Sequence, residues 1–338
     1  MRIAIVGPGI MPIPPPGWGA VEILIWELKQ AYERLGAQVL LVNNPHDDEI
    51  VAQVNAYRPD VVDLQYDGHH TFVERLHCRR IVITSHYGYL ENDALRDRTG
   101  YATTFQTFCR LARAGRVVVH CLSPGIRDVY LRHNVPPEAL FVVPNGASPE
   151  RFRYVPRRAD ARCADRAVYL GKIDARKRQR VYRDIACLDF AGNVAWDAGF
   201  DPAALGPRYL GEWSKEALYD RLTDYGALVL LSDGEAHPLV VCEALVAGLA
   251  VVVSEPAAAN LDRSLPFVAV VPSSRLDDVA YVEGVVRDML SKDVREAARA
   301  YGLANFAWPT VARRYFACLT RFALTGHIEN PDVENPDV

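Results

Sequence analysis

Short apolar runs alternate with amphipathic stretches from Met1 to Asn145. Runs rich in Val, Ile and Leu that alternate with stretches of helical periodicity predict a parallel sheet with crossover helices. The expected strands are Arg2–Val6, Gln38–Val42, Val61–Gln65, Arg80–Thr84, Val117–His120 and Leu140–Val143. The expected helices are Ala20–Leu35, Glu49–Tyr57, Ala102–Ala114 and Gly125–His133.

The alternation stops in the stretch from Pro144 to Asp165. This stretch contains Asn145-Gly146, Pro149, Pro156 and many arginines, and its apolar residues follow no clear period. Such a composition is typical of a connection between domains. We therefore expect residues 1–148 to form one domain and residues 149–305 to form a second one.

A second series of strands and helices follows this boundary. The expected strands are Ala167–Leu170, Tyr209–Leu210, Ala227–Leu231, Ala250–Val253 and Val268–Val271. The expected helices are Arg176–Leu188, Ser214–Tyr225, Val240–Ala247, Asp277–Leu290 and Val294–Leu303. Two such series joined by a hinge predict an α/β protein with two Rossmann-like domains, whose parallel sheets face each other across a cleft.

The C-terminal part of the chain predicts one more helix and a tail. A helix from Thr310 to Leu324 would carry an apolar stripe made of Val311, Tyr315, Phe316, Leu319 and Phe322. The segment Glu329–Val338 repeats Glu-Asn-Pro-Asp-Val twice and is polar. We expect residues 326–338 to be disordered.

Composition and charge exclude several classes of protein. The 338 residues fit two domains of roughly 150 residues each. The net charge of -4 gives no electrostatic reason to expect binding to nucleic acid. The seven cysteines are scattered without a C-x-x-C pair, which argues against a disulfide framework or a zinc site and fits the reducing cytosol. The longest apolar stretch, Pro238–Ser254, contains Glu243 and is too short to span a membrane, so we expect a soluble, cytoplasmic protein.

A glycine-rich turn after the first strand superficially resembles a dinucleotide-binding fingerprint. Gly7-Pro8-Gly9 follows the strand, but Pro12 stands where the third glycine belongs, and further prolines prevent a helix from starting there. We therefore do not expect NAD or FAD as a cofactor. The loop continues to Gly19, which would let a ligand approach the backbone closely. Amides at the start of the helix Ala20–Leu35 could then hold an anionic or hydroxyl group.

The segment from Glu235 to Glu243 carries the strongest functional signal. Pro238 suits the first turn of a helix, and the free amides of Leu239 and Val240 would form an anion site at that helix start. Glu235 lies on the preceding loop, and Glu243 lies one to two turns into the helix. Two carboxylates thus flank a phosphate-sized site at the carboxyl end of a parallel strand, where α/β folds bind ligands. Carboxylates accept strong hydrogen bonds from sugar hydroxyls, so a nucleotide sugar is a fitting ligand.

A basic loop would face these carboxylates. The expected strand Ala167–Leu170 ends in the loop Gly171–Arg178, in which Lys172 and Lys177 could balance the charge of a nucleoside diphosphate. The two lysines would also stabilise a departing diphosphate without a metal, and we expect neither a metal nor a cofactor. The wider stretch Arg151–Arg183 holds twelve Lys or Arg against three Asp. We expect mostly solvated surface there, with peripheral contact to an anionic membrane as the alternative.

These residues together resemble the retaining glycosyltransferases of glycosyltransferase family 4, which have the GT-B fold. The most specific element is the pair Glu235 and Glu243, which is followed by Ala244-Leu245-Val246-Ala247-Gly248 and is similar to the signature E-x7-E-A-hydrophobic-x-x-G. Five further motifs of the family occur in the same order: Gly19-Ala20-Val21-Glu22, Thr84-Ser85-His86, Pro144-Asn145-Gly146, Gly171-Lys172-Ile173 through Lys177, and Phe306-Ala307-Trp308. The resemblance extends from Met1 to about Leu324.

The resemblance implies a role for each of these residues. His86 and Glu235 would be catalytic, with His86 near the reacting centre and Glu235 on the transferred sugar. The donor would be bound by the remaining site residues: Glu243 on the ribose, Lys172 and Lys177 on the diphosphate, the Leu239 and Val240 amides assisting, and Gly19 on phosphate or acceptor. Residues 306–325 would form a helix that packs back on the N-terminal, acceptor-side domain.

The implied activity is the retaining, metal-independent transfer of a hexose-type sugar from a UDP- or GDP-sugar to a hydroxyl acceptor. Two alternatives stay open at this point: another GT-B enzyme of the epimerase kind, and a protein that binds nucleotide sugars without catalysis. The sequence does not identify the donor base, the sugar or the oligomeric state. The acceptor, whether a carbohydrate, a lipid-linked molecule or a small molecule, is equally open.

Overall fold

The computed structural model describes residues 1–17 and 19–328, and the chain divides into two units. Unit 1 contains Met1–Asn145 and resumes at Trp308, and unit 2 contains Gly146–Ala307. Of residues 326–338, which were expected to be disordered, the structure describes only those up to Ile328. Glu329–Val338 lies outside the described residues. Among the helices in the described part of the chain, none has both the length and the apolar character needed to cross a membrane.

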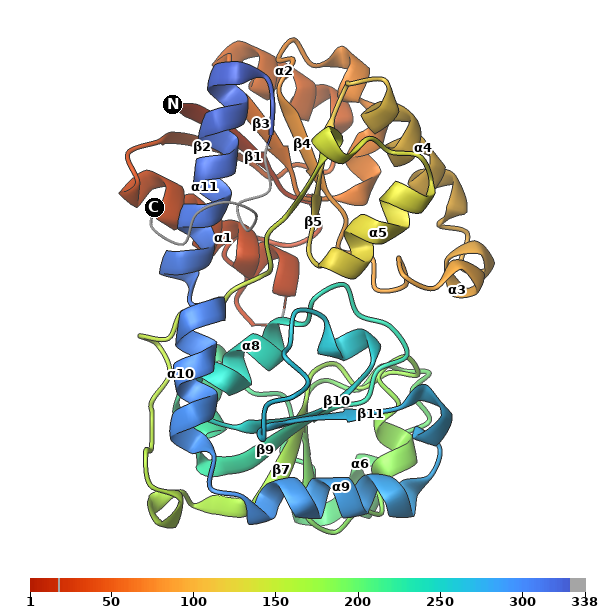
Figure 1. Cartoon of the computed structure of the whole chain (residues 1–338), viewed down its shortest axis with the longest axis vertical. Helices are drawn as coiled ribbons and strands as arrows, with labels where there is room; N and C mark the ends of the chain where they lie inside the picture. Colours follow the sequence, from red (N-terminus) through yellow and green to blue (C-terminus); the bar gives the residue numbers. More distant parts are fainter. Residues whose placement is uncertain (18, 329–338) are drawn as a thin grey trace. The chain divides into compact units, whose positions relative to one another are not determined.

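Unit 1 is built on a six-stranded sheet in which all paired strands are parallel. Its order is β2-β1-β3-β4-β5-β6, so the strand order reverses between β1 and β3. The strands are β1 Arg2–Val6, β2 Gln38–Val42, β3 Val61–Leu64, β4 Ile81–Thr84, β5 Val118–Cys121 and β6 Leu140–Val142. All six expected strands of this region are confirmed, with ends shifted by one residue at most. Figure 1 shows these strands and the helices connecting them.

Five helices connect the strands of unit 1: α1 Ala20–Arg34, α2 Asp47–Tyr57, α3 Asp93–Arg98, α4 Ala102–Arg113 and α5 Pro124–Arg132. The short helix α3 was not expected from the pattern. Its start is set locally, because the Asn92 side chain accepts a hydrogen bond of 3.0 Å from the Leu95 amide. Ser123 caps α5 in the same way through the Ile126 amide at 3.1 Å.

The last helix, α11 (Trp308–Thr325), belongs to unit 1 although it lies far from the other helices of this unit in the sequence. It packs against α1, and the rings of Tyr32 and Tyr315 meet edge to face with centroids 6.0 Å apart. The Arg80 guanidinium donates a 2.9 Å hydrogen bond to the Phe322 carbonyl oxygen. Side chains of this helix, among them Val311, Tyr315 and Leu319, are part of the hydrophobic core of unit 1.

Unit 2 contains a five-stranded parallel sheet of order β11-β10-β9-β7-β8. The strands are β7 Cys163–Leu170, β8 Leu188–Ala191, β9 Tyr225–Leu230, β10 Ala250–Ser254 and β11 Val268–Val271. The strand order of this sheet reverses between β7 and β9. In doubly wound sheets, the loops at the carboxyl ends of such a strand pair form the ligand-binding crevice.

Two expectations for unit 2 are wrong. The helix expected at Arg176–Leu188 is only a short 3-10 turn, Gln179–Tyr182, and Leu188 instead begins β8. No strand forms at Tyr209–Leu210, where one was expected, and Tyr209 makes only an isolated β-bridge to Phe190. At the 3-10 turn, the Tyr182 hydroxyl donates a 2.8 Å hydrogen bond to the Leu276 carbonyl oxygen, a tertiary contact that no local pattern shows.

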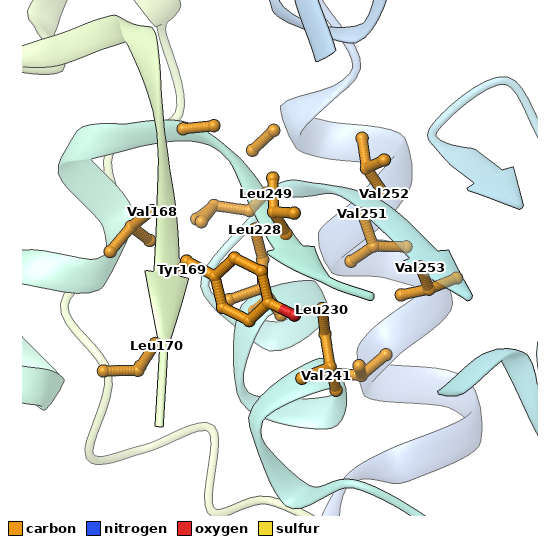
Figure 2. Close-up of a cluster of buried hydrophobic side chains, with 14 of the residues drawn as sticks. Val168, Tyr169, Leu170, Leu228, Leu230, Val241, Leu249, Val251, Val252 and Val253 are labelled. Atoms are coloured by element: carbon orange, nitrogen blue, oxygen red, sulfur yellow. The ribbon is translucent and has the colours of Figure 1, made fainter. Parts of the chain in front are cut away.

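The core of unit 2 lies on both faces of its sheet. The β-strands read as nearly continuous apolar runs because parallel strands with helices on both sides have no solvated face. Figure 2 shows part of this core, with side chains from β7, β9, β10, helix α8 and the turn between α8 and β10: Val168, Tyr169, Leu170, Leu228, Leu230, Val241, Leu249, Val251, Val252 and Val253.

The helices of unit 2 are α6 Pro202–Leu205, α7 Lys215–Arg221, α8 Leu239–Val246, α9 Val279–Ser291 and α10 Arg295–Phe306. Helices α8 and α10 pack closely because Gly302 of α10 has no side chain. A Cβ atom at Gly302 would lie 2.8 Å from both the Leu245 carbonyl carbon and the Val246 nitrogen. This close packing fixes the helix that carries Glu243.

Gly302→Ala is expected to lower the free energy of unfolding by about 1–3 kcal/mol, because the added methyl group overpacks the contact with α8. Gly284→Ala is the matched control, since Gly284 lies in α9 and has open space around its Cβ position. The control is expected to gain roughly 0.5–1 kcal/mol from reduced backbone entropy. Urea unfolding of both variants measures the difference, and equal stabilities would contradict the packing argument.

Candidate functional site

Two loops meet at the point where the strand order of unit 2 reverses. One loop follows β7 and the other follows β9. The Asp233 amide donates a 2.9 Å hydrogen bond to the Arg176 carbonyl oxygen, and Nη1 of Arg178 lies 3.0 Å from Oδ1 of Asp233. The loops are therefore fixed to each other at the place where an α/β sheet binds its ligand.

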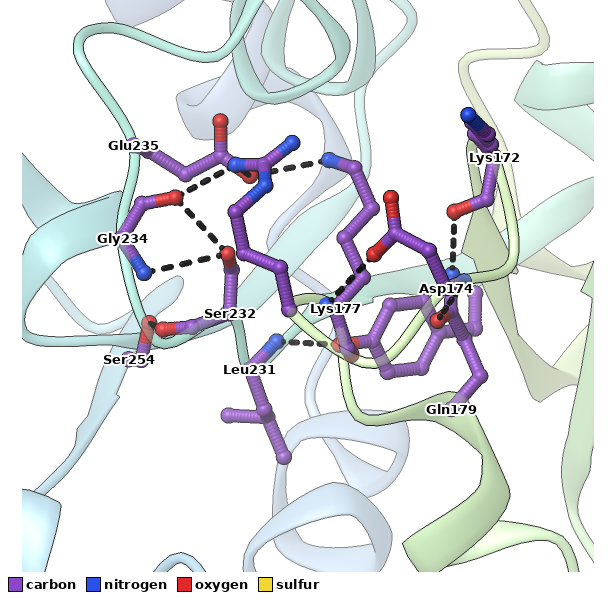
Figure 3. Close-up of polar contacts among 11 residues, drawn as sticks. Lys172, Asp174, Lys177, Gln179, Leu231, Ser232, Gly234, Glu235 and Ser254 are labelled. Carbon is purple, nitrogen blue, oxygen red and sulfur yellow. Dashed lines mark hydrogen bonds and ion pairs between the residues drawn. The ribbon is translucent and has the colours of Figure 1, made fainter. Parts of the chain in front are cut away.

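Glu235 is held between two cations on these loops (Figure 3). Nζ of Lys177 and Nη1 of Arg176 each lie 2.9 Å from Oε1 of Glu235, whose side chain is only 10% exposed. Burial by itself would raise the pKa of Glu235, but the charges and hydrogen bonds of Lys177 and Arg176 outweigh burial and hold this pKa below its ordinary value. Glu235 is therefore ionised at neutral pH.

The loop that carries Glu235 is rigidly supported from below. The Leu231 amide donates to the Tyr169 hydroxyl at 2.7 Å, and the Ser254 hydroxyl donates to the Ser232 carbonyl oxygen at 2.7 Å. The Ser232 hydroxyl in turn donates to the Gly234 carbonyl oxygen at 2.9 Å. Figure 3 shows these bonds beneath the Glu235 side chain, so the carboxylate stands on a preorganised loop.

The two lysines of the basic loop have different environments. Lys177 pairs with Glu235, and its own amide donates a 2.9 Å hydrogen bond to Oδ1 of Asp174. Lys172 is exposed, and its carbonyl oxygen accepts a 2.9 Å hydrogen bond from Nε2 of Gln179. The structure thus brings Lys177 to Glu235, whereas the Lys172 backbone is fixed and its side chain faces solvent.

The helix that follows Glu235 begins at Leu239. Pro238 was expected in the first turn of this helix, and it instead lies one residue before the helix begins. Pro238 is the N-cap, so the amides of Leu239 and Val240 belong to the first turn, where backbone N–H groups have no partner within the helix. These amides and the helix dipole favour an anion. Glu243 lies farther along the helix, only 12% exposed, with Nζ of Lys215 at 3.6 Å from its Oε1.

Sequence reasoning missed two cations of this site, Arg176 and Lys215. Arg176 stands inside the basic loop and could have been singled out by its position next to Lys177. Lys215 follows Ser214, whose side chain caps α7, and no sequence pattern connects it to Glu243. Each of the two predicted carboxylates therefore has at least one cationic partner, as buried or half-buried charges require.

His86 lies in unit 1, two residues after the end of β4, and its surroundings keep the ring neutral. Its Nε2 atom lies 3.0 Å from Oε1 of Gln65, which follows β3. Burial lowers the pKa of His86 to about 4. Behind Gln65, burial raises the pKa of Asp63 to about 7, although hydrogen bonds from Tyr315 and Gln65 act in the opposite direction.

Gly19 also lies in unit 1, as the residue before α1, with a φ of 133°. This left-handed backbone region strains any residue except glycine. A Cβ atom at Gly19 would lie 3.0 Å from Oε2 of Glu22, so the position also leaves little room for a side chain. Within residues 1–17 and 19–328, no three His, Cys, Asp or Glu side chains are placed to hold a metal ion.

Comparison with solved structures places this fold among glycosyltransferases. The chain is similar to AviGT4, a glycosyltransferase involved in avilamycin A biosynthesis, with a TM-score of 0.69, 17% identity and coverage of 97% of this chain and 99% of that one. It is similar to sucrose-phosphate synthase from Thermosynechococcus elongatus, with a TM-score of 0.71, 17% identity and coverage of 96% and 99%. It is also similar to Anabaena HepE in complex with UDP and glucose, with a TM-score of 0.68, 15% identity and coverage of 95% and 99%.

No protein-family model matches the sequence, and no curated protein is significantly similar to it. The structural similarities extend over nearly the whole chain at low sequence identity, so they establish the fold alone. The expected α/β architecture of the GT-B type is confirmed. Membership of glycosyltransferase family 4 and the roles of the site residues stay predictions.

Proposed function

We propose that this protein is a retaining, metal-independent glycosyltransferase of family 4. It would transfer a hexose-type sugar from a UDP- or GDP-sugar to a hydroxyl group of an acceptor. The observation that carries the proposal is the ionised Glu235, held by Lys177 and Arg176 at the switch point of unit 2, just before the start of α8. This combination of carboxylate, cations and helix start suits a sugar joined to a diphosphate.

The diphosphate fits the cationic side of the site. The free amides of Leu239 and Val240 and the dipole of α8 favour a phosphate at the helix start. Lys177 and Arg176 supply positive charge next to it, and the exposed Lys172 adds a further cation from the same loop. These groups would stabilise the negative charge that develops on the departing diphosphate.

The two carboxylates fit the sugar rings of the donor. Glu235 is ionised, so it accepts hydrogen bonds from hydroxyls of the transferred sugar. Glu243 lies within the second turn of α8 and would accept from the ribose hydroxyls. Anabaena HepE, which shares the fold, has been solved with UDP and with UDP-glucose, and this supports UDP as the first nucleotide to test.

The remaining parts of the proposal concern unit 1 and the setting of the reaction. His86 would contact the donor sugar near the reacting centre, and Gly19 would contact phosphate or acceptor. None of the seven cysteines is joined to another in a disulfide, which fits action in the reducing cytosol. The acceptor would be a carbohydrate, a lipid-linked molecule or a small molecule, and a peripheral contact of the arginine-rich segment with a membrane would suit a lipid-linked one.

A thermal-shift series with UDP, GDP and ADP tests the donor site. The matching nucleotide, at 100 times its dissociation constant, is expected to add roughly 2.7 kcal/mol to the free energy of unfolding. Uridine, which lacks the diphosphate, is the ligand control and is expected to give a much smaller shift. If none of the diphosphates shifts the unfolding transition, the proposed function is wrong.

The same ligand then separates transfer from its alternatives. The protein is incubated with the matching nucleotide sugar, first without an acceptor and then with a panel of glycoside and lipid-linked acceptors, and NMR follows the anomeric signals. A transferase forms an α-linked product from an α-linked donor only when an acceptor is present. Conversion of the donor to another nucleotide sugar without an acceptor would show an epimerase instead, and binding without any conversion would favour a non-catalytic protein.

A further inference from the structure

A line of hydrogen bonds connects helix α11 to His86 inside unit 1. The Tyr315 hydroxyl donates to Oδ1 of Asp63 at 2.9 Å, and Nε2 of Gln65 donates to the same oxygen at 2.7 Å. The other end of the Gln65 amide, Oε1, lies 3.0 Å from Nε2 of His86. Asp63 and Gln65 are both buried, so solvent does not compete for these bonds.

The carboxylate of Asp63 determines which way the Gln65 amide points. Oδ1 of Asp63 accepts hydrogen bonds from both the Tyr315 hydroxyl and Nε2 of Gln65, and it remains an acceptor whether or not Oδ2 carries a proton, so the NH2 group of Gln65 faces Asp63. The carbonyl oxygen of Gln65 then faces His86 and accepts a hydrogen bond from its Nε2–H. The neutral His86 ring therefore carries its hydrogen on Nε2, which leaves Nδ1 as the acceptor of the ring.

We propose that Gln65 is a positioning residue that fixes the tautomer and the ring orientation of His86. The role in sugar transfer rests on the proposed function, in which His86 contacts the donor sugar. In the Nε2–H tautomer, Nδ1 accepts a hydrogen bond from a sugar hydroxyl. The opposite tautomer would present a donor at Nδ1 and would lose that contact with the hydroxyl hydrogen.

A second carboxylate holds the backbone of His86. The Asp67 carboxylate accepts a hydrogen bond from the His86 backbone N–H. It also accepts one from the Tyr101 hydroxyl, which lies 2.8 Å from the Ser85 hydroxyl. The histidine thus has one polar contact at its backbone, to Asp67, and one at its ring, to Gln65.

Gln65→Met tests the proposal, because methionine has a similar length and cannot form either hydrogen bond. The full chain is labelled with 15N-histidine, and long-range 1H–15N NMR reads the tautomer of His86, whose signals are assigned with His86→Gln. The parent protein is expected to show His86 in the Nε2–H tautomer. The variant is expected to show a mixture of tautomers and a kcat reduced by at least about tenfold, as when the partner of a functional histidine is removed.

Gln53→Met is the matched control, since Gln53 is exposed on α2, outside this line of hydrogen bonds. It is expected to leave the His86 spectrum and kcat unchanged. Asp63→Asn is the second variant, because an asparagine can face Gln65 with either its oxygen or its NH2 group, and the preference of the amide orientation is lost. A partial shift toward the Nδ1–H tautomer is expected, even if Gln65→Met does not fold.

Two results would overturn the proposal: a parent protein with His86 in the Nδ1–H tautomer, or variants at Gln65 and Asp63 that keep the parent tautomer. The NMR measurement requires neither a donor nor an acceptor. Failure of the nucleotide to bind would therefore count against the proposed function, whereas an unchanged tautomer would count against the positioning role of Gln65.

Discussion

Lys177→Met is expected to lower kcat for sugar transfer by about 100- to 1,000-fold, the loss typical of removing one preorganised group that stabilises transition-state charge. Nζ of Lys177 lies 2.9 Å from Oε1 of Glu235 at the loop that would hold the departing diphosphate. Glu235 keeps Arg176 as a partner at 2.9 Å in the variant, so the buried carboxylate is not left without a counter-charge. Steady-state kinetics with the donor identified by thermal shift measure the effect.

Lys29→Met provides the comparison for this loss. Lys29 also pairs with a glutamate, Glu33 at 2.7 Å, but the pair lies on helix α1 and joins neighbouring turns. Exposed pairs of this type contribute roughly 0.3–0.5 kcal/mol to stability, so the variant should retain nearly full activity. A Lys177→Met enzyme with kcat within about threefold of the parent would contradict a role in stabilising the leaving group.

Glu243→Gln is expected to weaken the binding of the nucleoside diphosphate by about 10- to 150-fold. A hydrogen bond to a charged group contributes roughly 1.5–3 kcal/mol, and about 1.4 kcal/mol corresponds to a factor of ten. The substitution keeps the shape of the side chain and removes its charge, and Lys215, at 3.6 Å, then has no ionised partner in Glu243. Isothermal titration calorimetry with the nucleotide alone measures the affinity.

The matched control for this variant is Glu283→Gln on α9. Glu283 pairs with Arg287 at 2.6 Å, in a surface pair of the i, i+4 type. Its removal should leave nucleotide affinity unchanged, since α9 contributes no residue to the candidate site. If Glu243→Gln and the control bind the nucleotide with equal affinity, Glu243 does not bind the ribose of the donor.

The sheet of unit 1 could be predicted from the sequence because its strands are buried on both faces. The runs Ile3–Val6 and Ile81–Thr84 consist of Ile and Val with one Ala and one Thr, respectively, and such runs alternate with amphipathic helices along the chain. The strand Leu188–Ala191 of unit 2 escaped prediction because Asp189 interrupts its apolar run. The structure accommodates this carboxylate through an ion pair with Arg166 of the neighbouring strand β7, a contact that no local pattern shows.

The candidate site could be predicted where sequence neighbours suffice. Glu235, Leu239 and Val240 follow from one strand–loop–helix segment, and the basic loop follows from another. The contact between Lys177 and Glu235 depends on β7 lying beside β9, which is a property of the sheet order. Gln65 could not be predicted from the sequence, because its role depends on its contacts with Asp63 and His86, which only the structure shows.

The route of the chain through α11 determines the order in which the two units can be completed during synthesis. Unit 2 is one continuous segment, Gly146–Ala307, and all of it has been made before Trp308 is added. The core of unit 1 needs side chains of α11, among them Tyr315, which packs against Tyr32. At roughly 5–20 residues per second, the ribosome needs about 10–30 s to pass from Asn145 to α11. The N-terminal sheet, although it is made first, is therefore the last to obtain its complete core, and during this interval the face of α1 that carries Tyr32 lacks its partner helix.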